Sequence, residues 1–225
     1  GARRVLVARA VHPEYREVLK TYLEPAGDEI AEIGWAPDGR IDMAALEQSL
    51  SKGGVCCVAL QYPNFFGVIE DVAAAARRAR VANVPLVTAT TEAMALGVLK
   101  SPGELGATVA TAEGQSLGIP PQFGGPGVGL FGAKKEHLRS MPGRLCGETV
   151  DSAGRRAYVL TLSTREQHIR REKATSNICT NSGLNALAVT IYLSLMGPEG
   201  LRKTATLNHV RAGQAKAALA KAGVN

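Results

Sequence analysis

Residues 55–67 read VCCVALQYPNFFG, an apolar run that leads into a turn-forming segment. The run Val55–Gln61 is continuous rather than alternating, which is typical of a strand covered on both faces of a parallel sheet. Pro63 and Gly67 then end the strand and turn the chain, because proline cannot donate a ladder hydrogen bond and glycine accepts turn geometries. The stretch predicts a buried strand followed by a turn.

Strands and helices alternate on both sides of this stretch. Hydrophobic periodicity predicts strands at residues 5–8, 29–33 and 85–90 and helices at 13–23, 42–50 and 68–80. The first helix is expected to carry Tyr15, Val18, Leu19 and Tyr22 on one face. Such alternation predicts an α/β fold with a mostly parallel sheet and crossover helices.

The middle of the chain is rich in glycine. Residues 114–132 contain seven glycines and three prolines, and possible strands at 108–110 and 129–131 flank them. A loop of this length inside a compact α/β domain is usually functional. A phosphate cradle is one interpretation of residues 124–129, but they do not follow a strand and open a helix, so a tight backbone bend fits equally well.

The last third predicts a strand at 155–160, a polar loop at 164–180, an apolar helix at 183–196 ended by Gly197 and Pro198, and a basic helix at 199–222. We expect residues 1–197 to form a large domain and 198–225 to begin a smaller C-terminal domain. Both ends look cut, so we also expect an N-terminal portion with a phosphate-side loop before residue 1.

Composition restricts the class of protein. With 45% hydrophobic residues and no apolar run of about 18 residues, the chain is expected to be globular and cytoplasmic, without a membrane span. Cys56, Cys57, Cys146 and Cys179 lack a metal-ligand spacing and are expected to be buried free thiols. Much of the net charge of +6 lies beyond Glu199, on what we interpret as the solvated face of one helix, and nucleic acid is not an expected partner.

The segment 165–181 carries the best candidate site residues. Its first part holds Arg165, His168, Arg170, Arg171 and Lys173, and guanidinium groups can gather anions. The second part, including Thr175 and Asn177, has small hydrogen-bonding side chains and no charge, which suits a walled pocket better than an open surface. We interpret His168 as structural, because no nucleophile or carboxylate can be assigned to it.

Six motifs in one order resemble a known family. They are QYPNFFG at 61–67, GQSLGIP at 114–120, FGGP at 123–126, MPGR at 141–144, GETVD at 147–151 and the segment 165–181. Together they resemble the alpha subunits of the glycine cleavage system P-protein family over nearly the whole chain.

The resemblance implies a fold, a reaction and partners. The fold is the large domain of fold-type-I enzymes that use pyridoxal phosphate, the aspartate-aminotransferase-like fold. The reaction, glycine dehydrogenation with decarboxylation, uses the cofactor to decarboxylate glycine and passes the aminomethyl group to the lipoyl arm of the H-protein. The implied partner is a beta subunit that bears the pyridoxal phosphate, in an alpha2beta2 hetero-oligomer.

The resemblance also implies where the cofactor lysine would lie. In the beta half of the family this lysine precedes a Gly-Gly-Pro motif by eleven positions, and the same count back from Pro126 reaches Gln115. The segment 88–91, where the beta half has an aspartate, reads TATT, and no aspartate occurs between Asp71 and Asp151. We therefore expect a subunit without a covalent cofactor, in which Asn64, Gln115, Ser116 and the segment 165–181 contribute to a pocket or an interface.

Two other functions stay open at this stage. A self-sufficient pyridoxal-phosphate enzyme would need a Schiff-base lysine, for which Lys100 and Lys173 are weak candidates because such a lysine must be desolvated. A non-enzymatic module would bind an acidic partner through the basic last helix.

Overall fold

The computed structural model describes residues 3–143, 145–162, 166–174 and 182–224. The chain divides into two compact units. One comprises Gly1–Gly132 and Leu184–Asn225, and the other comprises Ala133–Gly183. The domain boundary that we predicted at residue 197 does not coincide with a boundary between these two units, and it stays a prediction.

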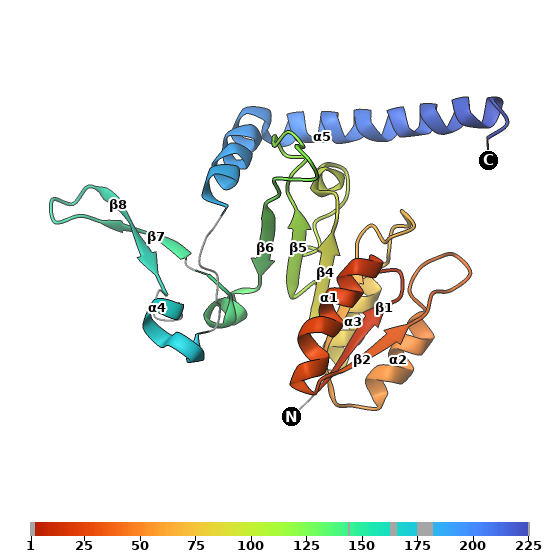
Figure 1. Cartoon of the computed structure of the whole chain (residues 1–225), viewed down its shortest axis with the longest axis horizontal. Helices are drawn as coiled ribbons and strands as arrows, with labels where there is room; N and C mark the ends of the chain where they lie inside the picture. Colours follow the sequence, from red (N-terminus) through yellow and green to blue (C-terminus); the bar gives the residue numbers. More distant parts are fainter. Residues whose placement is uncertain (1–2, 144, 163–165, 175–181, 225) are drawn as a thin grey trace. The chain divides into compact units, whose positions relative to one another are not determined.

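A six-stranded sheet forms the centre of the larger unit, in the order β2-β1-β3-β4-β5-β6. Its strands are β1 (Arg4–Ala8), β2 (Glu29–Ile33), β3 (Val55–Gln61), β4 (Leu86–Thr90), β5 (Val109–Glu113) and β6 (Gly129–Ala133). The first five pair in parallel, and β6 runs opposite to them at the edge (Figure 1). The expected α/β architecture is therefore present.

Three crossover helices connect the parallel strands: α1 (Pro13–Leu23), α2 (Met43–Ser51) and α3 (Val72–Val81). Asp42 caps α2 by accepting from the backbone N–H groups of Ala44 and Ala45. Asp71 caps α3 in the same way, so the prediction that this helix begins at residue 68 was wrong by four residues. The polar side chain of Asp71 stabilises the helix end there and leaves residues 68–71 in a loop.

The main core lies around β3. Val58 and Leu60 on this strand are buried, and Val58 is in register with Leu6 of β1 on one side and Leu86 of β4 on the other. Leu46 of α2 and Val72 of α3 belong to the same buried cluster. The continuous apolar run thus occupies a central strand, as predicted.

Helix α1 contributes less to this core than the others. None of its residues is buried, although Leu19 and Leu23 pack against the cluster from partly buried positions. Its predicted apolar face is thus only partly covered in the described residues: Leu19 packs against the core, whereas Val18 is 52% exposed and Tyr22 is 76% exposed.

A second buried cluster joins the glycine-rich segment to the last helix. Leu117, Ile119 and Val128 pack with Ala93 and Met94 of the 3-10 helix η2 (Ala93–Gly97), and with Val189 and Ala205. The last two belong to α5 (Gly183–Lys221), which bends at Gly197, where φ is 59° and ψ is −178°. Two helices were predicted here, and the structure joins them across this bend. Residues 206–224 are exposed.

The smaller unit contains a two-stranded antiparallel hairpin, β7 (Leu145–Val150) with β8 (Arg156–Thr161). It also contains the 3-10 helix η3 (Lys135–Ser140), the short helix α4 (Gln167–Arg170) and the 3-10 turn η5 (Arg171–Lys173). Strand β7 was not predicted, because its polar residues weaken the alternating pattern and pairing with β8 decides its conformation. The described part of the predicted loop 164–180 is helical rather than irregular.

The cysteines only partly match the expectation of burial. Cys56 and Cys57 are half-buried in β3, and desolvation raises the pKa of the Cys57 thiol to about 12. Cys146 is exposed on β7, so its predicted burial was wrong, and Cys179 lies outside the described residues. Among the residues that the structure describes, no helix is both long enough and apolar enough to cross a membrane.

Gly97 sets how closely α5 approaches η2. A Cβ atom there would lie 2.9 Å from both the Leu201 carbonyl oxygen and the Ala205 Cβ. Gly97→Ala should therefore lower the free energy of unfolding by about 1–3 kcal/mol, because overpacking forces the backbones apart. Urea unfolding measures this loss. Gly103→Ala is the control, since nothing lies within 4 Å of the added atom, and an equal loss in both variants would contradict the packing argument.

Candidate functional site at the carboxyl edge of the sheet

The carboxyl ends of β1, β3, β4 and β5 meet at one edge of the parallel sheet. Ligands of open α/β sheets bind beyond this edge, in the loops that follow the strands. Those loops supply the polar side chains His12, Asn64, Glu92, Gln115 and Ser116. Two of the predicted site residues, Gln115 and Ser116, thus lie in the loop after β5, and Asn64 lies in the loop after β3.

Asn64 holds the loop after β3 in place. Its buried Nδ2 donates to the Gly39 carbonyl and to Oε1 of Glu70, both at 2.9 Å, and its Oδ1 accepts from the N–H groups of Phe66 and Val68 at 3.1 Å. Glu70 also accepts from the Ile41 N–H at 2.9 Å. Because every polar atom of the Asn64 amide is used, its role in this chain is to fix loop geometry.

Glu70 is the buried acid of this group. Burial raises the pKa of its carboxyl above the ordinary value, and the hydrogen bonds from Asn64 and Ile41 oppose that rise. These contacts explain how a carboxyl group can be 4% exposed in the folded chain.

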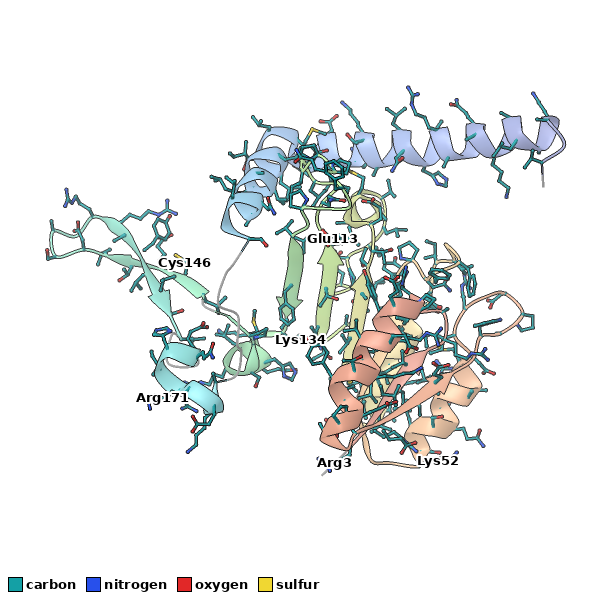
Figure 2. All side chains as sticks on the ribbon, in the orientation of Figure 1. Arg3, Lys52, Glu113, Lys134, Cys146 and Arg171 are labelled. Carbon is teal, nitrogen blue, oxygen red and sulfur yellow. The ribbon has the colours of Figure 1, made fainter. Side chains whose placement is uncertain are left out.

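Gln115 is folded back onto its own loop. Its Nε2 donates to the Pro126 carbonyl at 2.8 Å, and its backbone N–H donates to Oε1 of Glu113 at 3.0 Å. Glu113 lies at the end of β5 (Figure 2). The same carboxylate oxygen accepts from the Val128 N–H at 3.0 Å, so Glu113 holds both ends of the glycine-rich loop. The side-chain amide of Gln115 is therefore engaged in a hydrogen bond within its own loop.

Ser116 connects the loop after β5 to the segment after β4. Its hydroxyl donates to Oε1 of Glu92, which also accepts from the Met94 N–H at 2.8 Å and caps η2. Asn185 at the start of α5 donates from Nδ2 to the Gly127 carbonyl at 3.1 Å. Hydrogen bonds thus hold the glycine-rich loop at its base, through Glu113, and at one side, through Ser116 and Asn185.

A ring cluster occupies the part of the edge next to β1 and β3. The His12 N–H donates to Oε1 of Gln61 at 2.7 Å, and its ring centroid lies 5.2 Å from Tyr15 and 5.0 Å from Phe65. Burial raises the pKa of the Tyr15 phenol, and the nearby negative charge of Glu113 adds to the rise. The side-chain rings of His12, Tyr15 and Phe65 therefore fill this part of the edge.

The other predicted site residues are not at this edge. His168, Arg170, Arg171 and Lys173 lie in the smaller unit and are exposed, whereas Arg165, Thr175 and Asn177 lie outside the described residues. Within the described residues, Arg170 and Arg171 are exposed rather than enclosed. Their assignment to a site stays a prediction.

Glu92 and Glu113 were missed by the sequence analysis. Both follow the end of a predicted strand, which is the one signal that sequence offers for them. Neither belongs to a recognisable pattern of paired acids, and the contacts that give each a role span 24 residues for Glu92 and 15 for Glu113.

The family model described as "Glycine cleavage system P-protein" matches residues 1–225. The chain belongs to the glycine cleavage system P-protein family. It is 56% identical over 223 residues, 99% of this chain and 50% of the relative, to the probable glycine dehydrogenase (decarboxylating) subunit 1 of Anaeromyxobacter dehalogenans (strain 2CP-C). It is 52% identical over 221 residues, 98% of this chain and 49% of the relative, to the protein of the same name from Phenylobacterium zucineum (strain HLK1).

Solved structures agree with this assignment. The glycine decarboxylase (P-protein) of the glycine cleavage system, in an inhibitor-bound form, matches with a TM-score of 0.82 and 46% identity, over 90% of this chain and 45% of that one. A NifS-like protein from Rickettsia africae matches with a TM-score of 0.63 at 14% identity, over 97% of this chain and 50% of that one, which shows the fold alone. The predicted fold-type-I class is thus confirmed. This P-protein family chain spans about half the length of the curated relatives it matches.

The glycine-rich loop should depend on the Glu113 carboxylate. Glu113→Ala removes the shared acceptor of the Gln115 and Val128 N–H groups, and one such bond to a charged group contributes about 1.5–3 kcal/mol. Amide hydrogen exchange at these two residues should accelerate at least tenfold. The exposed Glu136 supplies the control variant Glu136→Ala. Unchanged exchange in Glu113→Ala would show that the loop is held by other contacts.

Proposed function

We propose that this chain is part of a glycine decarboxylase subunit that carries no covalent cofactor and acts with a partner subunit that binds pyridoxal phosphate. The reaction would decarboxylate glycine and transfer the aminomethyl group to the lipoyl arm of the H-protein. Membership of the P-protein family supports the reaction class. Gln115, at the position that the family resemblance assigns to the lysine, supports the division of labour.

The residues at the carboxyl edge do not fit a covalent pyridoxal phosphate. Glutamine has no amine to form a Schiff base, and Gln115 uses its amide on the Pro126 carbonyl. The segment at the end of β4 has threonines where an acid would be needed to keep the pyridine nitrogen protonated, and Thr88 is fully buried. These observations favour a partner as the site of the cofactor.

The alternative of a self-sufficient enzyme loses support. Lys100 and Lys173 are both exposed, whereas an amine that forms a Schiff base at neutral pH needs desolvation or a neighbouring charge to lower its pKa. The alternative of a basic binding module rests on charge alone: Arg202, Lys203 and Lys216 lie exposed along α5, and Lys203 already pairs with Glu199 at 2.9 Å.

The assembly and location belong to the same proposal. We expect a hetero-oligomer, because the relatives are named as subunit 1 and their names imply a second subunit, and the family resemblance implies the alpha2beta2 composition. The thiols of Cys56, Cys57 and Cys146 are free, which suits a reducing cytoplasm.

The decisive experiment is a glycine–bicarbonate exchange assay on the subunit that contains this chain, alone and mixed with its cofactor-bearing partner. Activity in the mixture alone supports the proposal. Borohydride reduction followed by mass spectrometry should detect no phosphopyridoxyl group on the isolated subunit. A stoichiometric adduct on Lys100 or Lys173, or activity of the isolated subunit, would refute the division of labour.

Arg170 and Arg171 should affect activity more than a lysine of the last helix. Buried against a partner or substrate carboxylate, a guanidinium contributes about 1.5–3 kcal/mol, whereas an exposed lysine contributes about 0–1 kcal/mol. Arg170→Ala and Arg171→Ala should therefore lower the exchange rate of the assembled enzyme at least tenfold, and the control Lys216→Ala should stay within about threefold. Equal rates in all three variants would remove the segment 165–181 from the site.

A further inference from the structure

Two adjacent cysteines lie near the start of β3, at Cys56 and Cys57, and both thiols are free. The pairing of β3 with β1 shifts register at this point. Val55 lies opposite Arg4, but the next residue of β1, Val5, lies opposite Cys57. Cys56 is therefore an extra residue in the strand, as at a β-bulge, where two residues of one strand face a single residue of its partner.

The extra residue changes the surroundings of Cys56. In a regular strand successive side chains point to opposite faces of the sheet, so burial alternates. Further along β3 it does alternate, since Val58 and Leu60 are buried and Ala59 between them is half-buried. Strict alternation would bury Cys56 on the face of Val58, yet Cys56 is half-buried like Cys57. The bulge thus leaves both thiols in half-covered surroundings.

The two thiols also interact with each other. Desolvation raises the pKa of the Cys57 thiol to about 12, and the neighbouring Cys56 thiol adds to that rise through its charge and a side-chain hydrogen bond. Cys57 is therefore a neutral S–H group near neutral pH, and a half-buried pair of thiolate anions would be costly. A ligand that suits this pair bonds both sulfurs and leaves no net charge on them.

Trivalent arsenic compounds meet both requirements. Zinc in a structural site takes four ligands, and Cu(I) held by two thiolates alone carries a net negative charge. A compound of the type R–As=O bonds two thiols instead: two As–S bonds form, the As=O bond breaks, and the oxygen leaves as water with the two thiol protons. Arsenic stays trivalent, so the step needs no oxidant or reductant, and the product is neutral.

We propose that Cys56 and Cys57 form a dithiol site that binds trivalent arsenic compounds through both sulfurs. Cys57 lies four residues before Gln61, the last residue of β3, which is about 13 Å along the strand at roughly 3.3 Å per residue. The dithiol site is thus separate from the candidate site at the carboxyl edge, and the inference does not rest on the proposed function.

The test uses the complete, reduced subunit that contains this chain, with phenylarsine oxide as the probe. Mass spectrometry should find one phenylarsenic group on the tryptic peptide 53–77, which contains Cys56, Cys57 and no other cysteine. The group should survive excess 2-mercaptoethanol, because one As–S bond holds the arsenic while the other exchanges, whereas 2,3-dimercaptopropanol should remove it. No adduct on this peptide, or an adduct that 2-mercaptoethanol removes, overturns the proposal.

Single-cysteine variants test whether both sulfurs are required. Cys56→Ser and Cys57→Ser should each weaken binding of phenylarsine oxide to peptide 53–77 at least about tenfold, because the second thiol acts at a high effective concentration. Cys146→Ser is the matched control, since Cys146 is an exposed thiol on β7, and its effect on the same peptide should stay within about twofold. Retained binding in either β3 variant, or an equal loss in the control, overturns the proposal. If a β3 variant fails to fold, the 2-mercaptoethanol result on the wild-type subunit decides.

Discussion

The buried hydrogen-bonded pair of Asn64 and Glu70 is the constraint on which the carboxyl edge depends. Asn64 ties the loop after β3 to the Gly39 carbonyl, and Glu70 ties it to the Ile41 backbone. An unpaired polar group at these buried positions would cost about 1–3 kcal/mol, so the two loops must stay in register with each other. That register also places Phe65 and Phe66 where their rings meet His12 and Trp35.

Around this frame the loop after β5 is held by acids. Glu113 and Glu92 accept hydrogen bonds from backbone and hydroxyl donors of the loop, and Gln115 closes it by bonding the Pro126 carbonyl. The geometry of this loop is therefore fixed by hydrogen bonds within the chain.

The two units differ in how they are stabilised. The sheet unit has a buried core on which α5 packs through Val189 and Ala205, helped by the small residue Gly97. The smaller unit has a hairpin whose Tyr158 and Leu160 are 60% and 57% exposed, and an isolated hairpin is marginally stable in water. Within the described residues, the ordered packing of the chain is therefore concentrated in the sheet unit.

The sequence by itself determined the parallel sheet, because a continuous apolar run such as Val55–Gln61 is compatible with few environments other than a central strand. That Gln115 has no amine is likewise a property of residue type alone. The sequence did not predict β7, the roles of Glu92 and Glu113, or the ring contacts among His12, Trp35, Phe65 and Phe66. β7 depends on its pairing with β8, and the others arise from contacts between residues far apart in the chain, such as Trp35 with Phe66 or Glu113 with Val128. The tertiary structure decided these features, because the periodicity of the sequence shows only which face of a helix or strand is apolar. Contacts between loops depend on where the ends of the parallel strands lie in space.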